Sequence, residues 1–326
     1  MHKILTAIFA ISLTAAAGVA VAAGAKPKAA CDSNDTVTAN CSAIWKGVGL
    51  PAYAGSVTGK TAVCHDRYVT SNDSASKTPD WVVELLTKAK LTNKFSRPPE
   101  DFSPDPCVPD NGSPDPGDYA KTPDHFAIGH QAPSEDFNNS VVNMRDTFVF
   151  SNAVPQVGPK FNGSVWKTLE TEVRKATVAR GTLYVMTGPV RGNGTERTIT
   201  IAKADNACGG AIELDGIKTA IVCKAVNQKK ATTCTTGVRV PVALYKIAYD
   251  PDRNAAYAFV LPNRAHPSGQ GRNYLEQWRV NVGVIEKLTG LKFFAALPAD
   301  KRAAVVDKCE PTTLWPAAAP KKTKPK

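Results

Sequence analysis

Histidine is scarce in this sequence, with five residues among 326. An isolated histidine is more often structural than catalytic, so each one needs polar companions before chemistry can be assigned to it. No C-x-x-C pair and no cysteine–histidine cluster occurs, which argues against a structural zinc site. The sequence also has no internal repeat and no pattern typical of a zinc finger or a recognition helix. Base-specific reading of nucleic acid is therefore not expected.

Long apolar runs are also missing after the N-terminus, so no later segment has the length of a membrane span. The N-terminus itself has a basic start, an apolar run at 4–13 and a small-residue A-x-A site at 20–22. This pattern predicts a cleaved signal peptide over residues 1–22. It implies an exported protein, periplasmic or secreted, that does not associate with a membrane after cleavage.

Acidic residues are fewer than basic ones, 29 against 40, and the formal net charge is +11. Such a basic protein suits a polyanionic partner, which could be nucleic acid, anionic lipid or a cell-envelope polymer. All eight cysteines follow the signal peptide, and an even number in an exported chain favours disulfides. Sequence does not fix the pairing, although Cys31–Cys41 is one candidate for a local loop.

The remaining chain predicts an α+β protein, with a mainly antiparallel β-sheet core and flanking helices. Helical spacing of apolar residues predicts helices over 164–178 and 280–290, the second ending at Gly290. A stretch dense in Pro, Asp and Gly at 97–123 predicts a long irregular loop. Strands are predicted where β-branched and aromatic residues gather, at 81–86, 146–152, 182–188, 197–202, 242–249 and 255–261.

The ends of the chain differ in composition from its middle. Residues 23–60 are interpreted as an N-terminal tail with a local disulfide segment, and residues 311–326 as a basic disordered tail. The segment from Cys208 to Cys234 is interpreted as an inserted hairpin, with a disulfide as one way to close it. Residues 61–310 remain as the main domain.

One histidine does have companions. His130 lies in the run Gly129-His130-Gln131-Ala132-Pro133, and a predicted strand ending in Ser151-Asn152 follows it. Asn162 comes next as a candidate helix N-cap. Trp166, Glu170 and Arg174 then follow at steps of four residues, which place side chains along one face of a helix. Taken singly, a cap and a Glu–Arg pair are usually structural, so only the joint pattern suggests a site.

This joint pattern resembles the DNA/RNA non-specific endonuclease family of ββα-metal nucleases, which includes endonuclease G and secreted bacterial nucleases. The matching pieces are the G-H-Q-A-P run, the S-N-A-V-P-Q run at 151–156, and the N-x-x-x-W-x-x-L-E-x-x-x-R pattern from Asn162. Weaker similarity extends over 68–298. One departure is clear, because Ala127 and Ile128 stand where the family has Asp and Arg.

The resemblance implies a Mg²⁺-dependent endonuclease, with Mn²⁺ as an alternative metal, that cuts DNA and RNA to 5′-phosphorylated products. It makes His130 the general base and Asn162 the protein ligand of the metal. Glu170 would accept hydrogen bonds from metal-bound water, and Asn152 would support the histidine. Arg97 and Arg174 would face the phosphate. A homodimer is left open.

Two further hypotheses remain. One is a catalytically weakened homologue that binds nucleic acid without efficient cleavage, because the Asp and Arg before Gly-His are replaced. The other is a basic envelope-binding protein held together by disulfides, which explains the charge and the cysteines but not the polar stripe on the helix.

Overall fold

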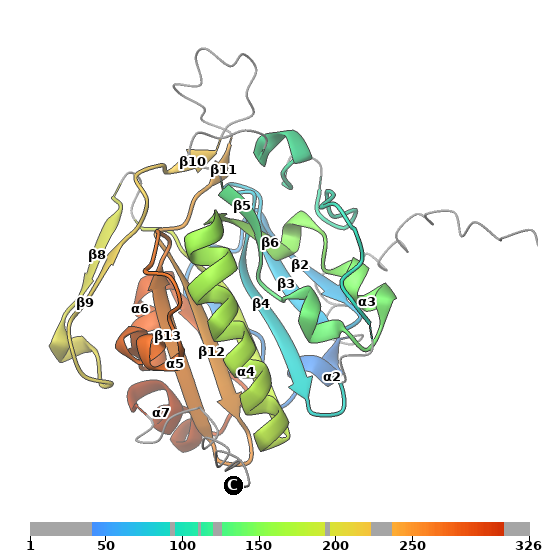
Figure 1. Ribbon diagram of the computed structural model, residues 1–326. Coiled ribbons are helices and arrows are strands. Elements are labelled where there is room, and N and C mark those ends of the chain that lie inside the picture. The colour runs from blue at the N-terminus through green and yellow to red at the C-terminus, as the bar shows by residue number, and fades with distance from the viewer. Residues whose placement is uncertain are drawn as a thin grey trace, which may run out of the picture.

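The computed structural model describes residues 41–91, 95–109, 112–119, 126–192, 196–222 and 237–309. Its centre is a seven-stranded antiparallel sheet with the strand order β14-β13-β12-β7-β4-β3-β2 (Figure 1). The strands of this sheet are β2 (Lys60–His65), β3 (Tyr68–Asp73), β4 (Thr78–Thr87), β7 (Thr182–Val190), β12 (Ala243–Asp250), β13 (Ala255–Pro262) and β14 (Arg279–Val280).

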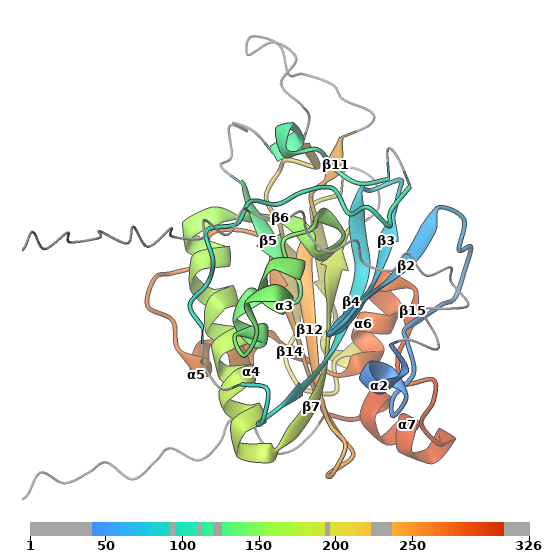
Figure 2. The ribbon, with the colours of Figure 1, turned by 90° about the vertical axis from the view of Figure 1, so that its right-hand side faces the viewer.

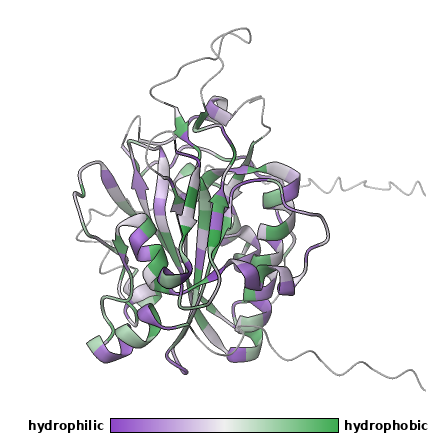
Figure 3. Ribbon diagram, turned by 90° about the vertical axis from the view of Figure 1, so that its left-hand side faces the viewer, coloured by the Kyte–Doolittle hydropathy of each residue, from purple (hydrophilic) through white to green (hydrophobic). Residues whose placement is uncertain are grey.

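The middle of the sheet is buried on both faces. Every residue of β12 and β13 is buried, and both strands are rich in β-branched and aromatic side chains. Such strands need cover on both sides, and Figure 2 shows helices on each face. These helices carry hydrophobic and hydrophilic segments side by side in Figure 3. The helices are α2 (Ser42–Trp45), α3 (Val141–Asp146), α4 (Lys167–Arg180), α5 (Arg272–Leu275), α6 (Val282–Thr289) and α7 (Ala299–Asp307).

Four small two-stranded sheets complete the described strands: β1 with β15, β5 with β6, β8 with β9, and β10 with β11. Their bounds are β1 (Ala52–Tyr53), β5 (Phe126–His130), β6 (Ala153–Val157), β8 (Thr198–Ile201), β9 (Ile212–Asp215), β10 (Ile221–Val222), β11 (Val238–Arg239) and β15 (Leu291–Lys292). Short 3-10 turns lie at Pro116–Tyr119, Ser134–Phe137, Phe150–Asn152, Lys203–Asp205 and Glu276–Trp278.

The β5–β6 pair leads directly into a helix. The strands are antiparallel, with His130 opposite Ala153 at one end and Phe126 opposite Val157 at the other. The chain then enters a π-helical segment, Gly158–Trp166, which continues as α4. Both strands contact the π-helical segment, so two strands and one helix form a compact ββα unit on one face of the large sheet (Figures 1 and 2). The expected α+β fold with a mainly antiparallel sheet is confirmed.

Two local predictions around this unit are wrong. Residues 146–152 do not form a strand, because α3 ends at Asp146, a 3-10 turn spans Phe150–Asn152, and β6 begins only at Ala153. The apolar and aromatic residues in 146–152 are buried in the core, and their character reflects this burial rather than an extended backbone. Asn162 is not an N-cap either, because the helical segment begins four residues earlier, at Gly158.

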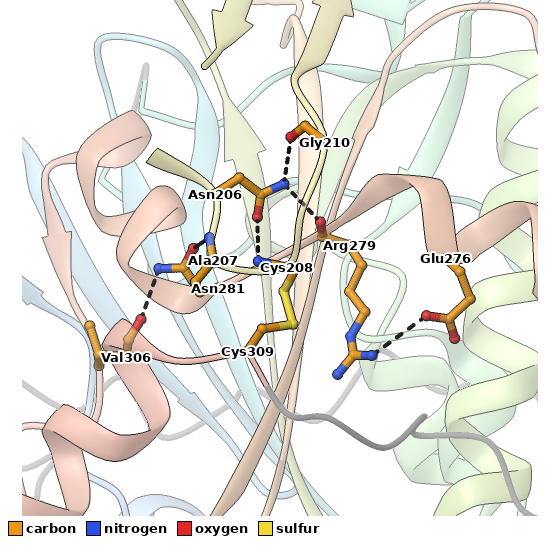
Figure 4. Close-up of a disulfide and its surroundings, with 9 residues drawn as sticks. All are labelled: Asn206, Ala207, Cys208, Gly210, Glu276, Arg279, Asn281, Val306 and Cys309. Carbon is orange, nitrogen blue, oxygen red and sulfur yellow. Dashed lines mark hydrogen bonds and ion pairs between the residues drawn. A yellow bond between two sulfur atoms is a disulfide. The ribbon is translucent and has the colours of Figure 1, made fainter. Parts of the chain in front are cut away.

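The disulfides also differ from the expected pairing. Cys41 is bonded to Cys64, so the Cys31–Cys41 loop is not formed. Cys208 is bonded to Cys309 across 101 residues of sequence, which rules out a bond that closes a 208–234 hairpin. Around this bond, Asn206 and Asn281 hold the turn at Cys208 against the end of α7 (Figure 4). Cys223 and Cys234 lie outside the described residues.

The N-terminal end of the described chain belongs to the core. Cys41, Ile44 and Val48 are buried in the main hydrophobic cluster, and β1 pairs with β15 near the C-terminus. The predicted signal peptide at 1–22 and the basic tail at 311–326 lie outside the described residues. Among the described helices, none has the length and hydropathy needed to cross a membrane.

Candidate active site

His130 ends β5, with its half-buried ring between two phenyl rings. The ring centroids of Phe102 and Phe148 lie 4.6 and 4.7 Å from that of the imidazole. The Nε2 atom lies 3.2 Å from the Thr147 hydroxyl oxygen. Burial, together with the nearby charge of Arg97, lowers the pKa of His130 to about 3. The imidazole is therefore neutral near pH 7, with a nitrogen lone pair that can accept a proton.

Asn152 secures the turn that follows His130. Its carboxamide is fully buried, accepts a hydrogen bond from the Ala132 N–H at 2.9 Å and donates to the Ala132 carbonyl at 3.0 Å. It also donates to the carbonyl of Thr147 at 3.0 Å. One side chain thus ties the backbone after His130 to the residue whose hydroxyl contacts the imidazole.

Arg97 lies beside the same aromatic group. Its guanidinium stacks over the Phe148 ring at 4.8 Å, and its side chain is exposed. Phe148 also contacts the His130 ring, so the cation and the imidazole share one aromatic neighbour. An exposed guanidinium next to a neutral imidazole provides donors for phosphate oxygens.

Asn162 lies in the middle of the π-helical segment and is partly exposed. Within the described part of the chain its carboxamide makes no hydrogen bond, so its oxygen is available to a ligand. The oxygen is neutral and hard, as Mg²⁺ prefers.

Glu170 lies two helical turns beyond Asn162, in the first turn of α4. Burial raises its pKa to about 7, and the negative charges of Asp136 and Glu135 add to this effect. The cations of Lys246 and Arg174 oppose the rise. Glu170 therefore titrates near neutrality and is partly ionised at pH 7.

Arg174 points toward the loop after His130 rather than into open solvent. Its guanidinium donates to Asp136 at 2.7 Å and to Glu135 at 3.0 Å, and its side chain is only 15% exposed. The carboxylates raise the pKa of this arginine against the effect of its burial. With both carboxylates engaged, the side chain joins α4 to the turn at Ser134–Phe137 and has little freedom to reach a phosphate.

Behind Glu170 lies a charged group that the motif did not include. Glu84 on β4 and Lys246 on β12 are both buried, on strands that flank β7. The ammonium of Lys246 donates to the Thr187 hydroxyl at 2.7 Å and lies over the Trp166 ring at 5.3 Å. Burial raises the pKa of Glu84 well above its usual range. A charged residue within each of the predicted core strands WVVELL and VALYKIAY was the available signal for this group.

The residues fit a hydrated divalent cation held by one protein ligand. Among the described residues no group of three or more His, Cys, Asp or Glu is arranged to hold a metal. Asn162 instead offers one oxygen without a hydrogen-bond partner among them, and Glu170 offers a carboxylate further along the same helix. A cation that keeps most of its water needs only such a ligand and an acceptor for the water hydrogens.

The fold and this motif are those of the ββα-metal class of nucleases. The sequence model of the DNA/RNA non-specific endonuclease family matches residues 50–300. The chain therefore belongs to this family.

Individual relatives agree with that assignment. The zebrafish (Danio rerio) mitochondrial nuclease EXOG is 31% identical over 76% of this chain and 65% of its own length. A nuclease of Syncephalastrum racemosum is 31% identical over 76% of this chain and 70% of its own length. The chain thus spans about two thirds of these relatives. A chain in the solved EndoG/EndoGI complex has the same fold, with a TM-score of 0.60 and 24% identity over 80% of this chain and 94% of that chain.

The comparisons correct the expected location. Several relatives, from zebrafish, human and two yeasts, are mitochondrial nucleases. The prediction of an exported protein is therefore wrong. A basic N-terminus followed by an apolar, alanine-rich stretch was not a sufficient signal for export.

Proposed function

We propose that this protein is a Mg²⁺-dependent nuclease that hydrolyses phosphodiester bonds in DNA and RNA without base specificity and leaves 5′-phosphorylated products. The observation that carries the proposal is one ββα unit bearing a neutral imidazole on its hairpin and an amide oxygen, without a described partner, on its helix. Mn²⁺ is an alternative metal. A homodimer stays a prediction.

Each side chain has a distinct task in this proposal. His130 takes the proton from the attacking water, since its neutral ring is already held by Thr147 and by two phenyl rings. Arg97 donates to the non-bridging phosphate oxygens. Asn152 keeps the turn after His130 in place, and Arg174 does the same for the turn at 134–137.

Asn162 would hold the metal, and Glu170 would accept hydrogen bonds from the water around it. When bound, Mg²⁺ supplies positive charge at the leaving 3′ oxygen and water that can protonate it. The low pKa of the free His130 is a poor match for a base that works near pH 7. The negative charge of a bound phosphodiester raises it and brings it closer to the working range.

A second candidate is a weakened homologue that binds nucleic acid without efficient cleavage. It is favoured by Ile128, which packs against an apolar cluster with Phe126 and Phe150 in the place where the family has an arginine. This position therefore supplies no cation next to His130.

Digestion of plasmid DNA separates the two candidates. With Mg²⁺ the wild-type protein should cut the plasmid, and cleavage should stop when the metal is chelated. His130→Ala should lower the rate by about a thousandfold, because general-base catalysis contributes 10²–10⁴-fold. Retarded but intact DNA with the wild-type protein would support the weakened homologue, and equal cleavage by His130→Ala would reject the base assignment.

A further inference from the structure

A buried ion cluster lies next to the candidate active site. His65, at the end of β2, is 1% exposed. Its Nε2 lies 3.1 Å from a carboxylate oxygen of Asp105, and its Nδ1 lies 3.5 Å from a carboxylate oxygen of Asp146, an ion-pair contact without a hydrogen bond. The three residues come from the sheet, from the loop at 95–109 and from the end of α3.

The cluster contains one cation between two anions. Burial by itself would lower the pKa of His65, but Asp105 and Asp146 raise it to about 9. Burial would raise the pKa of Asp105, but the charge of His65 and several hydrogen bonds lower it. The Tyr68 ring stacks on the imidazole at 4.5 Å, and burial raises the pKa of this phenol well above its usual value. The imidazolium is therefore the charged form of His65 at neutral pH, and the phenol stays neutral.

Asp146 lies next to a residue that contacts His130, and Asp105 binds the residue before Asn152, which secures the turn after His130. Asp146 is followed by Thr147, whose hydroxyl lies 3.2 Å from His130 Nε2. Asp105 accepts a hydrogen bond from the hydroxyl of Ser151, the residue before Asn152.

The loop that carries Asp105 also reaches the imidazole. Ser103 donates from its N–H to the Phe148 carbonyl at 3.1 Å and accepts from the Phe150 N–H at 3.0 Å. Its neighbour Phe102 packs on His130, with ring centroids 4.6 Å apart. Asp105 thus fixes the loop at a position two residues after Ser103.

We propose that His65 is a positioning residue of the nuclease centre, which clamps Asp105 and Asp146 and thereby holds the Thr147 hydroxyl and the Phe102 ring against His130. The proposal rests on the proposed function, since the geometry that His65 sets is that of the general base. His65 itself touches neither His130 nor the residues assigned to metal and phosphate. Its loss should therefore affect turnover rather than substrate binding.

The first test is His65→Gln, which removes the charge but keeps a polar side chain. A displacement of about 1 Å at a reacting group costs on the order of a hundredfold in rate, so kcat should fall by roughly that factor while KM is unchanged. Wild-type kcat should also decline above about pH 9, where His65 loses its proton and the two carboxylates lose their cation. This alkaline decline should be absent from the variant.

The matched control is Asp250→Asn. Asp250 is also buried and pairs with Arg180 at 3.0 Å and with Arg253 at 2.8 Å, near the C-terminal end of α4. The substitution disrupts a buried ion cluster of similar size, at the end of α4 that is remote from Asn162. Stability should fall in both variants, but kcat should fall only in His65→Gln. An equal loss of kcat in both would reduce His65 to a stabilising residue and overturn the proposal.

A measurement without turnover keeps this inference separate from the nuclease assignment. The ring nitrogen NMR signals of His130 should shift in His65→Gln and stay in place in Asp250→Asn. If the wild-type protein does not cleave DNA, the nuclease assignment fails while the NMR comparison still tests the clamp. Unmoved His130 signals in a folded His65→Gln protein would overturn the clamp even if that variant cleaves DNA more slowly. Should that variant not fold, His65→Gln with Asp105→Asn removes the cation together with the more buried of the two carboxylates and permits the same comparison.

Discussion

At the residue scale, the pKa values of the two histidines in this region are shifted in opposite directions. Burial and Arg97 lower the pKa of His130 to about 3, so the unfolded chain binds more protons there, and its contribution to stability is lost as the pH falls from 6.5 toward 3. The two aspartates raise the pKa of His65 to about 9, so its contribution is complete below pH 6.5 and is lost as the pH rises toward 9. Together these two residues favour the folded state most near neutral pH.

The ionisation of Glu170 should set how activity depends on pH. Lys246 lowers the pKa of this carboxylate, which burial has raised to about 7. Activity that requires an ionised Glu170 should rise with pH through this region. Lys246→Met should move the rise in kcat/KM by about one pH unit toward higher pH, since a nearby cation shifts a carboxylate by that order.

The matched control for this prediction is Lys246→Arg, which keeps the positive charge. It should leave the pH profile near that of the wild type. An unchanged profile in Lys246→Met would show that Glu170 does not need to be ionised, and it would remove Glu170 from the mechanism.

At the element scale, the site depends on how the β5–β6 hairpin meets the helix. The π-helical segment carries roughly 4.4 residues per turn, because its hydrogen bonds reach one residue further than those of an α-helix. Four-residue steps drift less around such a helix than around an α-helix, so Asn162 and Trp166 stay closer to one face. The same segment touches both strands of the hairpin that carries His130.

Gly129 provides the test of the hairpin. A β-carbon at this position would collide with the fully buried side chain of Gln156, which pairs with Ala127 across the hairpin, two residues along β6 from Val154, the partner of Gly129. Gly129→Ala should therefore lower the free energy of unfolding by about 2 kcal/mol, as overpacking in a closed core does. Urea unfolding measures this change.

Gly163→Ala is the matched control for the hairpin. The glycine lies in the π-helical segment, and an added β-carbon would meet nothing within 4 Å. Alanine there should leave stability equal or slightly higher, because it favours helical backbone. If both substitutions had the same effect on urea unfolding, the close approach of Gly129 and Gln156 would not matter for the fold.

At the scale of the whole molecule, the disulfides join regions that the sheet alone does not connect. The Cys208–Cys309 bond attaches the end of α7 to the turn before β9, at the edge of the molecule away from the β5–β6 hairpin (Figures 1 and 4). The bond closes a long loop in the unfolded chain, which is the condition under which a disulfide restricts that chain most.

Replacing both cysteines with serine should therefore affect stability and not chemistry. For Cys208→Ser with Cys309→Ser we expect a loss of about 2–4 kcal/mol in the free energy of unfolding, which is the usual range for a native disulfide. The kcat of the folded protein should be unchanged. A large loss of kcat without a change in urea unfolding would show that the bond acts on the active site instead.

Much of the site could be predicted from sequence because its parts are local. The run at 129–133, the Ser-Asn pair and the four-residue steps from Asn162 are each contained in a few residues, and their order identifies the family. The backbone at 146–152 could not be predicted correctly, because these residues were expected to form a strand and do not. Its apolar residues signal burial, and the backbone there is set by hydrogen bonds to Ser103 in a distant loop.

The sequence by itself determined the fold class, the strands β12 and β13 and the helix α4, because periodicity and short motifs depend on near neighbours. Its resemblance to the family proposed the candidate base and metal ligand, and these roles stay predictions. Only the tertiary structure decided the disulfide partners, the engagement of Arg174 by Glu135 and Asp136, and the placement of Glu84 and Lys246 behind Glu170. It alone joined His65 to Asp105 and Asp146. These contacts link residues far apart in the chain, and the order of strands in the sheet brings them together.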